Sequence, residues 1–320
     1  MELTLQETAN LLLEWDGITI LCHRKPDGDT TGAAYGLWYA LTGLGKKCRV
    51  RCADPAPSSF SYCYTGYREA EEFEEQHVVS IDVATAELLG DLKESYGERV
   101  ELAIDHHGTN SGYAEKQWVI GTASSASEMV YQLLPALGAP MTMQVGKCLY
   151  TGMATDTGCF QYSNTHPSTF RAAADLLEFG VPVSDINEAI FETKRPARLA
   201  LESRVLSGMR YYFGGKCAVI VVTEEMKQQY GVADEELEGL ASIPRTVEGV
   251  ELAVTIKQKP DGCRISVRTS KPVDAAALCA VFGGGGHVRA GGCFIAAPAD
   301  QALERILDAA RQNIYSGETP

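Results

Sequence analysis

Short apolar runs alternate with helix-like segments through the first half of the chain. The runs at 18–22, 47–52, 78–82 and 101–105 have the length and composition of buried strands. A capping box, Thr4 with Glu7, precedes the first apolar helical pattern. Strands that alternate with helices predict an α/β domain whose sheet is mostly parallel and flanked by helices.

The pattern changes twice further along the chain. From 124–134 to about residue 208 it is mostly helical, and strand-like runs return near Arg210 and continue to a glycine-rich run at 283–292. A last helix is predicted from about residue 299. We therefore predict a second, smaller α/β domain with a mixed sheet at the C-terminus. The chain then divides into a catalytic domain at 1–190, a linker helix at 191–208 and a substrate-binding domain at 209–320.

Composition and charge limit the possible partners. The chain has 320 residues, 45% of them hydrophobic, and a net charge of −14 without a run of Lys and Arg, so we expect no long nucleic acid as a partner. No apolar run approaches the ~20 residues of a membrane span, and the first residues do not resemble a signal peptide. We expect a cytoplasmic protein with no membrane partner, whose ten cysteines stay reduced.

Acidic residues and histidines gather at four places that the pattern sets at or just after the carboxyl ends of strands. In chain order these are His23 with Asp27 and Asp29, then Asp82, then Asp105 with His106 and His107, and finally Asp156. In open α/β sheets, sites form at the carboxyl ends of strands, so the four clusters can converge. Taken alone, the residues of each cluster have an ordinary explanation as turn residues or helix caps.

Convergence of these residues predicts a metal site. Carboxylates together with imidazoles favour Mn²⁺-like ions over Ca²⁺, and two ions side by side can stabilise the attacking and leaving oxygens of a phosphoryl displacement. Without metal, grouped carboxylates resist joint ionisation.

The motifs HRKPDGD, SIDVAT, AIDHHGTN and MATDTGCFQYSNT resemble, in order and spacing, the four motifs of the DHH phosphoesterase superfamily. The run GGGGHVRAGG, preceded by RISVRTS, is similar to the DHH-associated C-terminal domain. The combination resembles the branch of short-RNA oligoribonucleases and 3′-phosphoadenosine-5′-phosphate (pAp) phosphatases, with cyclic-di-AMP and pApA phosphodiesterases as close relatives.

The resemblance implies roles for individual residues and two divalent ions, most simply Mn²⁺. His23 and Asp27 would bind one ion, and a second set would bind the other: Asp29, His106 and Asp156. Asp82 would bridge the two ions and take part in catalysis. His107 would face the substrate phosphate, to stabilise charge or to donate a proton, and Asp105 would orient a ligating histidine or fix the loop.

The glycine run is a second candidate site. Glycines allow close backbone approach and present N–H groups to an anion. Together with a neighbouring strand arginine the run resembles a substrate pocket, whose candidate residues are Arg268, Gly285, Gly286, His287 and Arg289. The alternative for Arg268 is an exposed strand charge.

These features predict hydrolysis of short oligoribonucleotides to 5′-mononucleotides, with pAp 3′-phosphatase activity as a companion. The alternatives are a cyclic-di-AMP or pApA phosphodiesterase and, from another class, a nucleotide-binding sensor with a degenerate site. The sequence leaves the preferred nucleotide, the cleavage polarity, the physiological metal and the oligomeric state open, a homodimer being one option.

Overall fold

The computed structural model describes residues 1–68, 73–237, 239–270 and 273–316. The chain divides into two compact units, Met1–Thr193 and Lys194–Pro320. Each unit has its own sheet and its own hydrophobic core, so each is described by itself.

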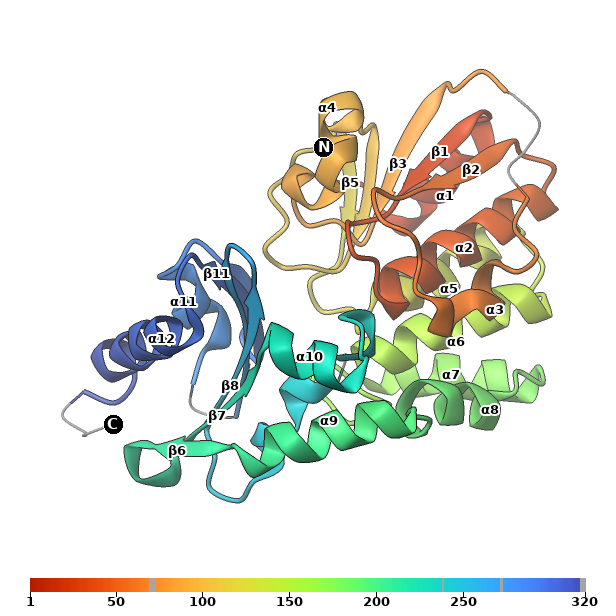
Figure 1. The fold of residues 1–320 in the computed structure, drawn as a ribbon. Helices are drawn as coiled ribbons and strands as arrows, with labels where there is room; N and C mark the ends of the chain where they lie inside the picture. The colour runs from red at the N-terminus through yellow and green to blue at the C-terminus, as the bar shows by residue number, and fades with distance from the viewer. Residues whose placement is uncertain (69–72, 238, 271–272, 317–320) are drawn as a thin grey trace. The chain divides into compact units, whose positions relative to one another are not determined.

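The N-terminal unit alternates strands and helices over its first half and is helical in its second half (Figure 1). Its strands are β1 (Ile18–Leu21), β2 (Cys48–Arg51), β3 (His77–Ile81), β4 (Leu102–Asp105) and β5 (Lys116–Val119). Its helices are α1 (Leu5–Glu14), α2 (Gly28–Gly43), α3 (Ser61–Tyr64), α4 (Lys93–Tyr96), α5 (Ala126–Leu137), α6 (Met143–Asp156), α7 (Pro167–Glu178) and α8 (Val183–Asn187).

The five strands form one parallel sheet in the order β2-β1-β3-β4-β5. The main core lies between this sheet and the helices α1, α2, α5 and α6, and a smaller apolar cluster covers the other face. The predicted fold class is confirmed, and the four predicted strands are present as β1 to β4. The fifth strand was not predicted, because its sequence KQWV holds only two apolar residues. It lies at the edge of the sheet, where a strand can be partly polar.

Helices α2 and α6 pack closely through glycines. A Cβ atom on Gly32 would lie 2.3 Å from the backbone oxygen of Cys148, and one on Gly28 would lie 2.4 Å from the Thr155 hydroxyl. Neither helix backbone can retreat without opening the core between them. This close contact matters for the site, since α2 begins and α6 ends beside it.

We expect Gly32→Ala to destabilise the protein by about 1–3 kcal/mol, the usual cost of overpacking a core. Gly43→Ala, at the last position of the same helix, is the matched control, because a Cβ there would meet nothing within 4 Å. Urea unfolding of both variants measures the difference. Equal stabilities for the two variants would show that α2 and α6 can separate freely.

The C-terminal unit contains a six-stranded mixed sheet in the order β10-β11-β9-β8-β7-β6. Only β7 and β8 are parallel among its paired strands. The strands are β6 (Arg210–Tyr212), β7 (Cys217–Val222), β8 (Leu252–Lys259), β9 (Gly262–Thr269), β10 (Gly285–His287) and β11 (Ala290–Ile295). The helices are α9 (Pro196–Ser207), α10 (Glu224–Tyr230), α11 (Ala275–Ala280) and α12 (Ala299–Asn313).

Helix α9 occupies most of the segment predicted as a linker. Its Leu201 and Val205 are buried against Ile220 and Val222 of β7, so this helix is part of the C-terminal core. Helix α12 covers the other side of the sheet through Leu303 and its neighbours.

All ten cysteines are free thiols in the structure. Among the described residues, no helix is both long and apolar enough to cross a membrane.

Candidate metal centre

Three neighbouring strands of the parallel sheet deliver candidate residues to one edge. His23 follows β1, Asp82 follows β3, and His106 follows β4. These strands are adjacent in the order β1-β3-β4, and the strand order changes direction between β1 and β3. Ligands of open α/β sheets bind at such a switch point.

Asp82 lies at the centre of the cluster and is 2% exposed. Its Oδ2 lies 3.6 Å from His23 Nε2, and its Oδ1 lies 3.4 Å from His106 Nε2 and 3.5 Å from His107 Nδ1. The backbone at Asp82 is left-handed, with φ of 60°, while its N–H donates to the Ile104 carbonyl. Such a conformation costs about 1 kcal/mol or more for a residue with a Cβ, and strain of this kind is typical of functional sites.

Asp27 and Asp29 occupy the start of α2. Asp27 is the N-cap of this helix, and Asp29 lies in its first turn. Asp27 Oδ1 accepts hydrogen bonds from the Asp29 and Thr30 amides and lies 3.5 Å from His23 Nε2. Asp27 therefore caps the helix and also faces the cluster.

Asp29 has partners that the sequence did not reveal. Its Oδ2 accepts a hydrogen bond of 2.7 Å from the Ala126 amide, and its Oδ1 accepts one of 2.9 Å from the Ser127 amide. These amides belong to the first turn of α5, where backbone N–H groups lack helical partners. The N-terminus of α5 thus holds the Asp29 carboxylate in place, with Oδ2 3.8 Å from His106 Nε2.

The position predicted for Asp156 was wrong in one respect. The residue does not follow a strand but is the last residue of α6. The apolar run before it lies on a helix buried on most sides, and such a run cannot be told from a strand by periodicity alone. Its Oδ2 still lies 3.8 Å from His106 Nε2, so the structure brings this residue into the cluster.

Asn164 holds Asp156 through a hydrogen bond of 3.2 Å from its Nδ2 to Asp156 Oδ2. The same amide also reaches the carbonyl oxygens of Ser124 and Asp156. Sequence reasoning did not single out this residue, although it lies within the fourth motif. Asn164 fixes a candidate ligand without touching the centre of the cluster.

We expect Asn164→Ala to weaken Mn²⁺ binding by about 10–100-fold, the range found when a partner of a metal ligand is removed. Asn10→Ala on the exposed side of α1 is the control, since Asn10 bonds only to Gln6 among the described contacts. Calorimetric titration with Mn²⁺ measures both variants. Unchanged affinity in Asn164→Ala would exclude a positioning role for this amide.

The ring orientations of two histidines favour coordination through Nε2. His23 Nδ1 lies 2.9 Å from the Arg24 carbonyl, and His106 Nδ1 lies 3.4 Å from the Ala123 carbonyl. A carbonyl can only accept, so each Nδ1 carries the proton. In both residues Nε2 then faces the carboxylates, and once it has lost its proton it supplies the lone pair that a metal ligand requires.

The crowding of carboxylates shifts the pKa values of the whole cluster. Burial opposes a charge on His23, but attraction by Asp27 and Asp82 outweighs it and raises the pKa of His23 to about 10. Burial and the charge of Asp82 raise the pKa of Asp29 well above its usual value. Burial, opposed by His106 but reinforced by Asp82, raises the pKa of Asp156 to about 6. The cluster draws in protons because it lacks positive charge of its own.

These residues fit a pair of divalent ions. Among the described residues, buried Asp82 Oδ1 has no hydrogen-bond partner, a costly state that coordination relieves. Three groups of potential ligand atoms include this residue, and two of them match the predicted ligand sets: His23, Asp27 and Asp82, and Asp29, Asp82 and His106. Oxygen and imidazole donors in this mixture suit Mn²⁺ and similar ions.

His107 and Asp105 form a separate pair beside the cluster. His107 Nδ1 donates to Asp105 Oδ1 over 2.7 Å, and Asn110 donates to Asp105 Oδ2 over 2.6 Å. Burial opposes ionisation of Asp105, but the hydrogen bond from His107 outweighs it and lowers the pKa of this carboxyl. The pair leaves Nε2 of His107 as the ring atom for another partner.

The predicted glycine site is a β-hairpin in the C-terminal unit. Gly285 and Gly286 pair with Gly292 and Gly291 of β11, and Val288 and Arg289 form the turn. Gly286 has a φ of 132° and its Cβ would strike the Ala290 carbonyl, so this glycine is required by packing. Gly285 is exposed and has open space around it, so packing does not explain it.

The two arginines at this hairpin differ in environment. Arg289 donates from Nη1 to the carbonyl oxygens of Ser270 and Val273, over 2.9 and 2.6 Å, and so has a structural role that the sequence did not reveal. Arg268 is half-buried on β9, next to Ala290 of β11, and His287 is exposed on β10.

Comparisons with known proteins agree with these observations. Residues 17–153 match the model of the DHH family, N-terminal domain, and residues 214–316 match the DHHA1 domain. A bifunctional oligoribonuclease and PAP phosphatase, NrnA, of Thermus thermophilus is 32% identical over 93% of this chain and 90% of its own. A protein of the same name from Bacillus subtilis is 26% identical over 87% and 89%.

A solved structure is similar over nearly the whole chain. The crystal structure of an exopolyphosphatase-related protein from Bacteroides fragilis has a TM-score of 0.87 and 25% identity, and covers 96% of both chains. The similarity therefore extends over both units.

Proposed function

Because this chain belongs to the DHH family, with a DHHA1 domain after the DHH domain, we propose that it hydrolyses short oligoribonucleotides to 5′-mononucleotides with two Mn²⁺ ions and removes the 3′-phosphate of pAp. The relatives from Thermus thermophilus and Bacillus subtilis carry both activities in their names. A short substrate also suits a chain of net charge −14, which would repel a long polyanion.

The observation that carries the proposal is the shared carboxylate at the centre of the cluster. Asp82 belongs to both groups of potential ligands. In this assignment His23 and Asp27 would hold one ion, Asp29, His106 and Asp156 would hold the other, and Asp82 would be a ligand of both. When bound, the ions would supply Lewis acidity and lower the pKa of water.

The chain's own residues position the substrate and move protons. His107 is held by Asp105 through Nδ1, so its Nε2 is the atom that we assign to the substrate phosphate, either to stabilise charge or to donate a proton to the leaving oxygen. In the C-terminal unit we assign contacts with the nucleotide to Arg268, Gly285, Gly286 and His287. Arg289 would support them by fixing the turn.

A side-by-side measurement of rates tests the proposal. Purified protein with Mn²⁺ is given pAp, RNA of two to five nucleotides, pApA and cyclic-di-AMP, and the products are separated by chromatography. We expect turnover of the RNA and pAp, with a kcat/KM that falls as the RNA lengthens. Preference for cyclic-di-AMP or pApA would replace the proposed substrate, and tight binding of nucleotide without any hydrolysis would favour a sensor.

A further inference from the structure

Two cysteines lie side by side behind the candidate metal centre. Strands β1 and β2 are parallel, with Ile20 opposite Val50, and the ladder continues through a hydrogen bond from the Cys22 amide to the Arg51 carbonyl. This pattern sets Cys22 opposite Cys52. Because side chains alternate along a strand, both thiols share the face of Ile20 and Val50, which packs towards α2.

The spacing of these cysteines suits a disulfide. Neighbouring strands lie about 4.8 Å apart, within the Cα separations of roughly 4.4–6.8 Å that disulfides require. No large backbone movement is therefore needed to join them.

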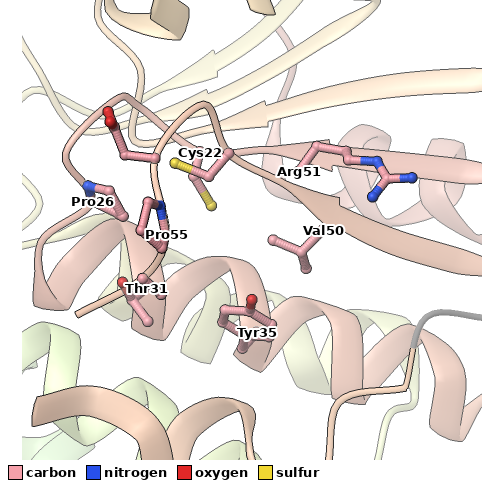
Figure 2. Close-up of a pocket in the computed structure, with 10 residues that line it drawn as sticks. Cys22, Pro26, Thr31, Tyr35, Val50, Arg51 and Pro55 are labelled. Atoms are coloured by element: carbon pink, nitrogen blue, oxygen red, sulfur yellow. The ribbon is translucent and has the colours of Figure 1, made fainter. Parts of the chain in front are cut away.

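A cavity of about 190 Å³ gives access to both thiols. Figure 2 shows Cys22 and Val50 on the strand side of this cavity, across from Thr31 and Tyr35 on α2. Thr31 is 1% exposed, and its hydroxyl, in the cavity wall, has no hydrogen-bond partner in the described structure. Such an unpaired hydroxyl offers a hydrogen bond to a small polar molecule.

The cysteine pair is linked directly to a candidate metal ligand. Cys22 precedes His23 in the chain, and the Cys52 thiol donates a hydrogen bond of 3.2 Å to the His23 carbonyl. A disulfide would remove this hydrogen bond, so the backbone at His23 would no longer be held by the Cys52 thiol. His23 would then be free to shift relative to Asp82, which follows the neighbouring strand β3.

We propose that Cys22 and Cys52 are an oxidation site, where a small hydroperoxide converts the two thiols to a disulfide and weakens divalent-ion binding at the adjacent centre. The oxidation of the two cysteines concerns the thiols alone. The effect on ion binding rests on the function proposed above. Cys52 is the more exposed of the two and reacts first.

The reaction balances as two steps. The Cys52 sulfur attacks the terminal peroxide oxygen and the O–O bond breaks to give a sulfenic acid. The second oxygen takes up the thiol proton and leaves as water, or as an alcohol from an alkyl hydroperoxide. The Cys22 sulfur then attacks the Cys52 sulfur, the S–O bond breaks, and the hydroxyl leaves as water with the Cys22 proton. The two thiols lose two electrons in total, and one peroxide is reduced.

The test treats the full-length, Mn²⁺-loaded protein with hydrogen peroxide, followed by alkylation, digestion and mass spectrometry. We expect a linked peptide pair containing Cys22 and Cys52 that disappears with dithiothreitol. Calorimetry should show that Mn²⁺ binds about tenfold more weakly after oxidation. This is the lower end of the loss of metal affinity that follows when a residue supporting a metal ligand is disturbed. Neither readout depends on which nucleotide the protein hydrolyses.

Two variants sharpen the result. Cys52→Ser keeps a hydroxyl donor for the His23 carbonyl but cannot form the disulfide, so its Mn²⁺ affinity should be the same before and after peroxide. Cys159→Ser removes a half-exposed thiol near Asp156 and should respond to peroxide as the wild type does. Oxidation of Cys159 without any Cys22–Cys52 link would overturn the proposal. A link that leaves Mn²⁺ affinity unchanged would refute the effect on the centre.

Discussion

Asp82→Asn is expected to lower turnover of short RNA and pAp by roughly 10³-fold, comparable to the loss of a single preorganised group that stabilises the transition state. Asp82 is a member of both predicted ligand groups, so its replacement should affect the binding of both ions. Asparagine is the appropriate replacement because it tolerates the left-handed backbone at this position, whereas alanine would add strain.

Thermal unfolding separates this effect from a loss of fold. Wild-type protein should gain about 2.7 kcal/mol of stability when Mn²⁺ is present at a hundred times its dissociation constant, and Asp82→Asn should lose most of that gain. Without metal, the variant should unfold within a few degrees of the wild type. Asp308→Asn, on the exposed side of α12, makes the same change in net charge and should behave as wild type in both assays. Near-normal turnover in Asp82→Asn would refute the central position of this carboxylate.

Much of the fold follows from local patterns in the sequence. The apolar runs of β1 to β4 are short and end in polar residues, and the capping box of α1 is formed as expected, with Thr4 and Glu7 bonded to each other. Parallel pairing then requires the strand ends to meet at one edge, which explains why His23, Asp82 and His106 converge. No long-range information is needed for this step.

The parts that the sequence did not reveal depend on contacts between distant segments. The Asp29 carboxylate meets the amides of α5, which lie almost a hundred residues further along the chain. No periodicity marks such a contact, because one partner is the backbone. The same reason explains Asp156, which is positioned by the end of a helix packed against α2 and by Asn164. The glycine run was recognisable, but its hairpin pairing depends on β9 and α11 beside it.

Asp29→Ala should differ from Asp82→Asn in its effect on the metal-free protein. Both variants remove a buried carboxylate from the cluster, so both should lose turnover and most of the stabilisation by Mn²⁺. Only Asp29 also accepts hydrogen bonds from two backbone amides at the start of α5. Its removal leaves these buried donors without partners, which costs about 1–3 kcal/mol for each unsatisfied group.

The opposing contribution is the repulsion between Asp29 and Asp82, which burial strengthens and which the alanine variant relieves. A charge repulsion is partly relieved already when Asp29 binds a proton, as its raised pKa indicates, whereas an unpaired amide has no such alternative. We therefore expect a net loss of about 2 kcal/mol in the free energy of unfolding, measured with urea in the presence of a chelator. Asp29→Ala as stable as Asp82→Asn under these conditions would mean that water replaces the carboxylate at the N-terminus of α5, and that this helix does not depend on the metal centre for its cap.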